Sequence, residues 1–255
     1  MSTLETGAND LVDDHPGQPS ATPTATPVDL PHGTGTPPFT AVLWDLDGTI
    51  ADSAPGITRS LARMFESFGL PVPSPAELVS YVGPPILDSF RLHGLDRHPG
   101  LDAAVDRYRE FYRADGELAD ELFPGVAEII TALHAAGIPQ STATSKPEGA
   151  ATRILTHFGI ADRLDFITGA GGDETRGTKR EVVAEALGRL RSIGADLSNV
   201  VLVGDRFYDV EGATANGVPT IYTTWGYGRI GEEVGAVAVA NTPEQLRTLL
   251  GLPAA

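Results

Sequence analysis

The chain has no cysteine among its 255 residues. This absence excludes disulfide bonds, thiolate zinc sites and a cysteine nucleophile, and it is typical of proteins from a reducing compartment. Basic residues are also scarce: 18 Lys and Arg stand against 34 Asp and Glu, which gives a formal net charge of −16. Nonspecific binding to nucleic acid or to an anionic membrane is therefore not expected, because neutralising phosphate groups requires Lys and Arg.

Long hydrophobic runs are missing as well. No apolar stretch approaches the roughly 20 residues needed to span a bilayer. The first ten residues have neither the basic region nor the apolar stretch of a secretory signal. Hydrophobic residues still make up 41% of the chain, enough for a sizeable core. We therefore expect a soluble cytoplasmic protein, either a monomer or a homodimer.

Residues 1–38 differ in composition from the rest. They contain seven prolines, few apolar side chains and no Lys or Arg. Such a segment buries too little surface to offset the entropy lost on ordering, so we expect a flexible tail. Its five acids account for less than a third of the net charge, and the remainder of the chain keeps a net charge of −11.

From Phe39 onward, short apolar segments alternate with helical patterns, which predicts an α/β fold with a doubly wound, mostly parallel sheet. The expected strands, apolar and often β-branched as in buried parallel sheets, are 41–45, 138–144, 165–168, 199–204 and 218–223. The expected helices are 125–136, 147–157, 178–191, 207–216 and 243–250.

Between residues 54 and 122 this alternation stops. Apolar residues recur there at helical spacing in two stretches, Ile57 to Phe68 and Val105 to Tyr112, with no strand pattern between them. We interpret this region as an inserted helical cap whose aromatic stripes form its core. The expected domains are therefore a tail (1–38), a core (39–53 and 123–255) and a cap (54–122).

The sequence Asp45-Leu46-Asp47-Gly48-Thr49 follows the first expected strand. A strand places residues i and i+2 on one face, so both carboxylates should point the same way and disfavour each other's ionisation. A divalent cation such as Mg²⁺ would offset that repulsion. An ordinary Asp-x-Asp-Gly surface turn is the alternative.

Further polar residues follow the other expected strands. Thr144, Ser145, Lys179, Asp205 and Asp209 all fall at the carboxyl edge of the sheet, where ligands bind in open parallel sheets. Acids, hydroxyls and a lysine that converge in this way predict a site for a metal and a phosphate. Each residue also has a simpler interpretation. Thr144 or Ser145 could cap the helix near Pro147, Asp209 could favour a helix N-terminus, and Lys179 could be solvated.

These motifs together resemble those of the haloacid dehalogenase superfamily, most members of which are phosphatases. The resemblance covers about residues 39–252. Asp45 to Thr49 with Asp52-Ser53 is similar to its first motif, Thr144 to its hydroxyl motif, Lys179 to its basic motif, and Gly204-Asp205 with Asp209 to its acidic motif. The helical insert is similar to the C1-type cap of the phosphoglycolate phosphatase-like branch. Val82-Gly83-Pro84-Pro85 and Ser145-Lys146-Pro147 also resemble that branch.

The resemblance implies a Mg²⁺-dependent phosphomonoester hydrolase that works through an aspartyl-phosphate. Asp45 would be the nucleophile, Asp47 the acid and base, and Thr144 with Lys179 would bind the phosphoryl oxygens. The metal ligands would be Asp45, Asp205 and the main-chain carbonyl of Asp47. The resemblance gives the remaining residues supporting roles: Ser145 near the substrate, Asp209 on Lys179 or on a metal-bound water, and Asp52 at the substrate or as a helix cap.

The substrate is expected to be a small phosphorylated metabolite selected by the cap, with Arg59 and Arg91 as candidate contacts. Phosphoglycolate is the first candidate substrate. As alternative functions, a 5'-nucleotidase, a phosphotyrosine phosphatase and a phosphosugar mutase remain open. Gly226-Tyr227-Gly228-Arg229-Ile230-Gly231 also matches the dinucleotide-binding fingerprint. We reject that interpretation because too few residues follow for a crossover helix, and we expect a flexible loop at the sheet edge.

Overall fold

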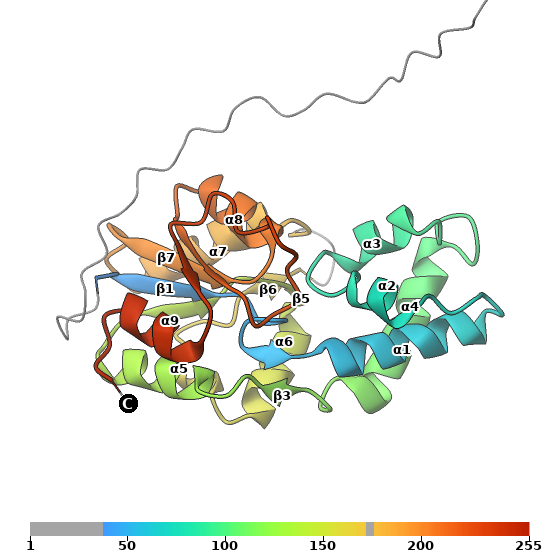
Figure 1. Cartoon of the computed structure of the whole chain (residues 1–255), viewed down its shortest axis with the longest axis horizontal. Helices are drawn as coiled ribbons and strands as arrows, with labels where there is room; N and C mark the ends of the chain where they lie inside the picture. The colour runs from blue at the N-terminus through green and yellow to red at the C-terminus, as the bar shows by residue number, and fades with distance from the viewer. Residues whose placement is uncertain (1–37, 172–175, 255) are drawn as a thin grey trace, which may run out of the picture.

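The computed structural model of the protein describes residues 38–171 and 176–254 (Figure 1). The tail expected over residues 1–38 therefore lies outside the described residues, except for Pro38. Among the described residues, no helix combines the length and the apolar character needed to cross a membrane.

A five-stranded parallel sheet forms the centre of the molecule, with strand order β4-β1-β7-β8-β9. Its strands are β1 (Ala41–Trp44), β4 (Gln140–Thr142), β7 (Val200–Gly204), β8 (Thr220–Thr223) and β9 (Ala238–Ala240). In register, Leu43 of β1 lies beside Ser141 of β4 and Leu202 of β7. Each of β1, β4 and β7 is buried throughout, as a strand covered on both faces must be.

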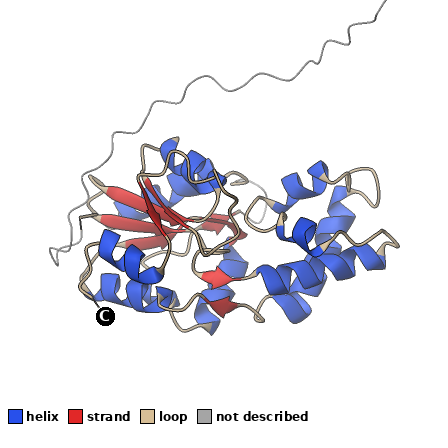
Figure 2. Cartoon of the chain, in the orientation of Figure 1, coloured by secondary structure: helices blue, strands red, loops and turns tan. Residues whose placement is uncertain are grey.

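Helices cover both faces of this sheet (Figure 2). Val42, Trp44, Val201 and Val203 share a hydrophobic cluster with residues of α5 (Val126–Ala135), α6 (Glu148–His157) and α9 (Pro243–Leu249). The alternate residues of β1 and β7 form a second cluster with α7 (Lys179–Ser192) and α8 (Phe207–Thr214). The doubly wound α/β fold is therefore confirmed.

Three sequence predictions about strands need correction. The strand expected over 138–144 is split into β4 and a second strand, β5 (Thr144–Pro147), which pairs with β6 (Gly169–Ala170). The strand expected over 165–168 is reduced to an isolated bridge between Ser141 and Phe166. The apolar run 236–240, which was not assigned to a strand, contains the edge strand β9. Short strands of two to four residues leave too little pattern to locate their ends.

The region inserted after β1 is helical, and it extends to one side of the sheet (Figure 1). It contains α1 (Ala54–Ser67), α2 (Pro75–Val79), α3 (Ile86–Leu92), α4 (Leu101–Phe111) and a π-helical turn (Tyr112–Gly116). Its side chains form their own hydrophobic cluster, in which Tyr81 packs edge-on against Phe65 and Phe90. We call residues 54–122 the cap.

Two short antiparallel strands join the cap to the rest of the chain. They are β2 (Ala51–Asp52) and β3 (Glu121–Leu122), and Asp52 pairs with Glu121. The chain enters and leaves the cap at this point. Neither strand was predicted from the sequence, because two residues carry no recognisable period.

Candidate active site

Three buried carboxylates meet at the carboxyl ends of β1 and β7. Asp45 follows β1, Asp205 follows β7, and Asp209 lies in the first turn of α8. One carboxylate oxygen from each lies within 4.8 Å of those of the other two. A backbone hydrogen bond of 2.9 Å from Asp45 N to the carbonyl of Val203 fixes the first of them at the sheet edge. The predicted convergence of Asp45, Asp205 and Asp209 is thus present in the structure.

Lys179 is the first residue of α7, and its side chain reaches back into this cluster. A capping box between Thr178 and Glu181 starts the helix at that position. Lys179 Nζ lies 2.8 Å from Asp45 Oδ1 and 2.7 Å from Asp209 Oδ1. Burial alone would lower the pKa of Lys179, but the Asp209 and Asp45 carboxylates raise it above its ordinary value. Lys179 is therefore a fixed cation, and its interpretation as a solvated surface residue is wrong.

Asp205 has no such cation. Thr49 Oγ1 donates a hydrogen bond of 3.1 Å to its Oδ1, and the backbone N–H of Tyr227 donates one of 2.7 Å to its Oδ2. Among the described residues, no Lys, Arg or His lies within ion-pair distance of Asp205. Burial, followed by repulsion from Asp209 and Asp45, raises the pKa of Asp205 well above its ordinary value.

This donor set fits a divalent cation. Three carboxylates share one lysine, so the cluster carries an excess of negative charge, and hard cations bind oxygen ligands. Asp45, Asp205 and Asp209 would supply the carboxylate ligands. The main-chain carbonyl of Asp47, expected as a further ligand, stays a prediction.

Asp47 lies apart from this cluster and has a different partner. Its Oδ1 lies 3.0 Å from Lys146 Nζ, and both side chains are at most 10% exposed. In the sequence, Lys146 was recognised only as part of a motif and was given no role. A signal was available, because a strand that begins at Thr144 places Thr144 and Lys146 on the same face.

Thr144 and Ser145 do not cap the helix that follows them. The N-cap of α6 is Pro147, without a side-chain hydrogen bond, so the capping alternative is wrong. The Thr144 hydroxyl is buried and accepts a hydrogen bond of 3.2 Å from the backbone N–H of Lys146. Ser145 lines the cavity described below.

The glycine-rich loop after β8 closes the site from one side. A Cβ on Gly226 would lie 2.2 Å from Asp205 Oδ2, so this close approach requires glycine. The loop joins β8 to the edge strand β9, as expected for a loop at the sheet edge, and it also lies against the candidate site. No helix occurs over residues 224–237, which agrees with rejecting the dinucleotide fingerprint.

Tyr227 in that loop connects the site to the cap. Its hydroxyl donates a hydrogen bond of 2.6 Å to Asp52 Oδ1 and accepts one of 2.9 Å from the backbone N–H of Ala54, the first residue of α1. The N-cap of α1 is Ser53, so Asp52 does not cap the first helix of the cap. Asp52 instead holds the tyrosine of the loop.

A cavity of 330 Å³ lies between the cap and the site. Asp47, Ser145 and Lys146 line it from the core side, and Tyr81, Tyr108 and Tyr112 are among its walls on the cap side. Among the described residues, five basic side chains line it against two acidic ones: Arg109, Arg113, Lys146, Arg153 and Arg176 against Asp47 and Glu117.

The cap arginines expected at the substrate do not line this cavity. Arg59 donates a hydrogen bond of 3.2 Å to the carbonyl of Asp115, and Arg91 forms an ion pair of 2.9 Å with Asp88. Two other cap arginines line the cavity instead: Arg109 of α4 and Arg113 of the π-helical turn. Helical spacing alone does not show which face of the cap is turned toward the core.

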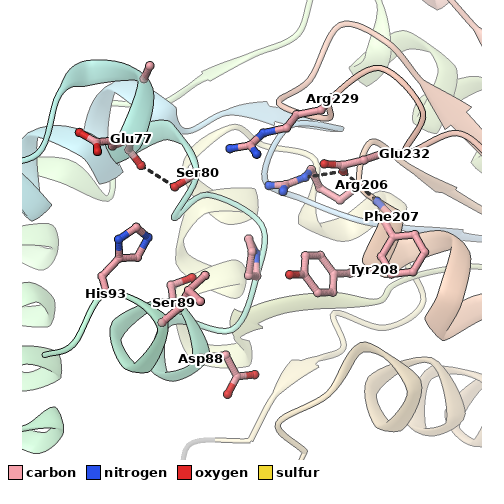
Figure 3. A pocket seen from close by; sticks show the side chains of 13 residues that line it. Glu77, Ser80, Asp88, Ser89, His93, Arg206, Phe207, Tyr208, Arg229 and Glu232 are labelled. Carbon is pink, nitrogen blue, oxygen red and sulfur yellow. Dashed lines mark hydrogen bonds and ion pairs between the residues drawn. The ribbon is translucent and has the colours of Figure 1, made fainter. Parts of the chain in front are cut away.

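A larger hollow of 860 Å³ lies beside α2, α3 and the start of α8 (Figure 3). Arg206 lies within it and is held by Glu232 at 3.0 Å and by the carbonyl of Val82 in the cap. Neither the carboxylate cluster nor Asp47 lines this hollow, so it is separate from the candidate active site.

Residues 42–223 match the family described as haloacid dehalogenase-like hydrolase. The chain belongs to this family. The tyrosine-protein kinase PtkA of Mycobacterium tuberculosis is 40% identical over 215 residues, 83% of this chain and 72% of that protein. A 5'-nucleotidase of Pseudomonas aeruginosa is 36% identical over 73% of this chain and 83% of its own length. A phosphoglycolate phosphatase of Rhodospirillum rubrum is 32% identical over 84% of this chain and 91% of its own length.

Solved structures agree with this assignment. A predicted phosphatase from Clostridium acetobutylicum superimposes with a TM-score of 0.75 at 33% identity, covering 82% of this chain and 96% of that one. The family assignment, its phosphoglycolate phosphatase-like branch and the phosphatase class of enzyme are confirmed.

Proposed function

We propose that the protein is a Mg²⁺-dependent phosphomonoester hydrolase that forms an aspartyl-phosphate on Asp45. One observation carries this proposal. The two acids of the first motif have separate partners, since Asp45 is bound to Lys179 beside Asp205 and Asp209, whereas Asp47 is bound to Lys146. This separation supports metal and nucleophile chemistry at Asp45 and proton transfer at Asp47.

In the first step, a carboxylate oxygen of Asp45 attacks the phosphorus and the bond to the leaving oxygen breaks. Asp47 gives its proton to that oxygen, and the alcohol departs. Lys179 and Thr144 bind the phosphoryl oxygens. In the second step, Asp47 takes a proton from water, which attacks the phosphorus and frees Asp45 with release of phosphate. A bound Mg²⁺ would reduce the repulsion between the anionic nucleophile and the anionic phosphoryl group.

The cavity supports a small anionic substrate. Its volume of 330 Å³ and the excess of basic side chains among the described residues that line it favour a phosphorylated metabolite over a macromolecule. Phosphoglycolate is the first candidate from the branch. A nucleoside monophosphate and a phosphotyrosine follow, and a phosphosugar mutase is a further alternative. The identity to PtkA adds a second candidate reaction, phosphoryl transfer to a protein tyrosine.

A panel of phosphomonoesters assayed with Mg²⁺ tests this proposal. We expect release of inorganic phosphate from at least one small ester, loss of turnover in Asp45→Asn, and reversible loss on chelation. Full activity in metal-free buffer would refute the Mg²⁺ requirement. Transfer from ATP to a tyrosine peptide without hydrolysis of any ester would favour the kinase reaction instead.

A further inference from the structure

Lys146 is a buried cation to which the two-step mechanism above gives no role. Its side chain is 5% exposed, and its Nζ lies 3.0 Å from Asp47 Oδ1. Within residues 38–171 and 176–254, no other Lys, Arg or His lies within ion-pair distance of Asp47. Burying an ammonium group is costly unless it is paired. The Asp47 carboxylate supplies that partner, so the burial of Lys146 depends on this contact.

The cap holds Lys146 from the other side. Lys146 Nζ donates a hydrogen bond of 2.8 Å to Tyr112 Oη and lies 4.6 Å from the centre of that ring. The Tyr112 hydroxyl in turn donates a hydrogen bond of 3.3 Å to Asp120 Oδ2. Tyr112 belongs to the π-helical turn that ends the cap helices, and it is buried. The cap thus fixes the position of the cation that contacts Asp47.

We propose that Lys146, held in place by Tyr112, is a positioning residue that orients Asp47 for proton transfer. The proposal rests on the function given above. The ion pair occupies Oδ1, so Oδ2 is the oxygen left to exchange the proton. As the Asp45–phosphorus bond forms and the ester bond breaks, the proton passes from Asp47 to the leaving oxygen. The ammonium group then stabilises the carboxylate that remains.

The dependence of the rate on the leaving group separates this role from phosphate binding. An alkoxide must be protonated as it leaves, whereas p-nitrophenolate leaves without a proton. The parameter kcat/KM reports the steps through the first irreversible one, and so includes departure of the leaving group. A residue that acts through Asp47 changes the ratio of kcat/KM for alkyl and aryl esters. A residue that binds the phosphoryl group lowers both values together.

The test compares p-nitrophenyl phosphate with an alkyl phosphate of the same charge, in Mg²⁺, for wild type and Lys146→Met. We expect the alkyl-to-aryl ratio of kcat/KM to fall at least tenfold, part of the roughly 10²–10⁴ that a general acid contributes. Asp47→Asn sets the largest possible change in this ratio. Arg113→Met is the matched control, because it removes a cation of the same cavity that has no ion pair with Asp47, and its ratio should not change.

Tyr112→Phe is the second variant, since it keeps the ring and removes only the hydroxyl that contacts Lys146. We expect a smaller fall in the same ratio. Equal losses on both esters in Lys146→Met would overturn the proposal, and so would an unchanged ratio in Tyr112→Phe if Lys146→Met does not fold. A wild-type protein inactive on every ester would instead refute the proposed function.

Discussion

At the scale of single residues, the division of work between Asp45 and Asp47 comes from their partners. Both acids follow the end of β1, but each forms an ion pair with a different buried lysine. Carboxylates in different surroundings can take different roles in one reaction. The sequence predicted that the two acids converge with Asp205. It did not predict the lysine at Asp47, because the ion pair depends on where β5 begins.

Replacing Asp205 tests the carboxylate cluster. Its pKa is raised by burial and by Asp209 and Asp45, so the ionised side chain destabilises the metal-free fold at neutral pH. Without Mg²⁺, we expect Asp205→Asn to raise the free energy of unfolding by about 1–3 kcal/mol. Mg²⁺ at ten times its dissociation constant should raise the free energy of unfolding of wild type by about 1.4 kcal/mol. It should raise that of the variant little or not at all.

Urea unfolding with and without Mg²⁺ measures both effects. Asp162→Asn is the control, because its side chain is 69% exposed and surface substitutions change stability by about 0.5 kcal/mol or less. Equal stabilisation of wild type and Asp205→Asn by Mg²⁺ would show that the cluster does not bind the ion.

At the scale of elements, the long helices were predictable and the short strands were not. Helix α7 was expected over 178–191 and spans Lys179–Ser192, because its apolar period repeats over several turns. Strands β2 and β3 contain two residues each, and their pairing depends on where the chain enters and leaves the cap. The two residues that were assigned no function also lie in short or irregular segments. Lys146 is in the four-residue strand β5, and Tyr227 is in the loop after β8.

The loop after β8 should stabilise the entry to the cap through Tyr227. Tyr227→Phe removes a donor to Asp52 and an acceptor for the backbone of Ala54. We expect a loss of about 1–3 kcal/mol in the free energy of unfolding, because both partners lose a hydrogen bond in a partly buried site. Tyr208→Phe is the matched control, since the Tyr208 hydroxyl makes no hydrogen bond with the described residues. Similar losses in the two variants would contradict this role.

Asp120, close to the point where the chain leaves the cap, should make the free energy of unfolding depend on pH. Burial, with repulsion from Asp47, outweighs Lys146 and raises the pKa of Asp120 from 3.8 to about 7. The folded state therefore binds this proton more tightly than the unfolded state does. Its contribution to stability is present at low pH and is lost as pH rises from about 4 to about 7.

Asp120→Asn removes this dependence and keeps an acceptor for Tyr112. Its stability relative to wild type should therefore rise by about 2 kcal/mol between pH 5 and pH 7. Asp196→Asn serves as a control, because hydrogen bonds from Ser198 lower the pKa of Asp196 and place its titration below this range. Unfolding free energies at several pH values measure the difference. A constant difference between Asp120→Asn and wild type would contradict the raised pKa.

At the scale of the whole molecule, an acidic chain surrounds a basic cavity. The net charge is −16, yet five of the seven charged residues that line the cavity within the described part of the chain are Lys or Arg. Fold class, family and the converging acids were predictable, because they follow from local motifs and from the rule that parallel strands end at one edge. The residues that line the cavity were not predictable, because the orientation of the cap depends on contacts between segments that are distant in sequence.

The most direct test of the account is to trap the aspartyl-phosphate. In Asp47→Asn, p-nitrophenyl phosphate should still phosphorylate the enzyme, because its leaving group needs no proton. Hydrolysis should then stall, because no base activates water. Acid quenching and peptide mass spectrometry should therefore find one phosphoryl group on Asp45 of Asp47→Asn in Mg²⁺, and none in Asp45→Asn. A phosphoryl group on another residue, or no phosphoenzyme while p-nitrophenol is still released, would contradict it.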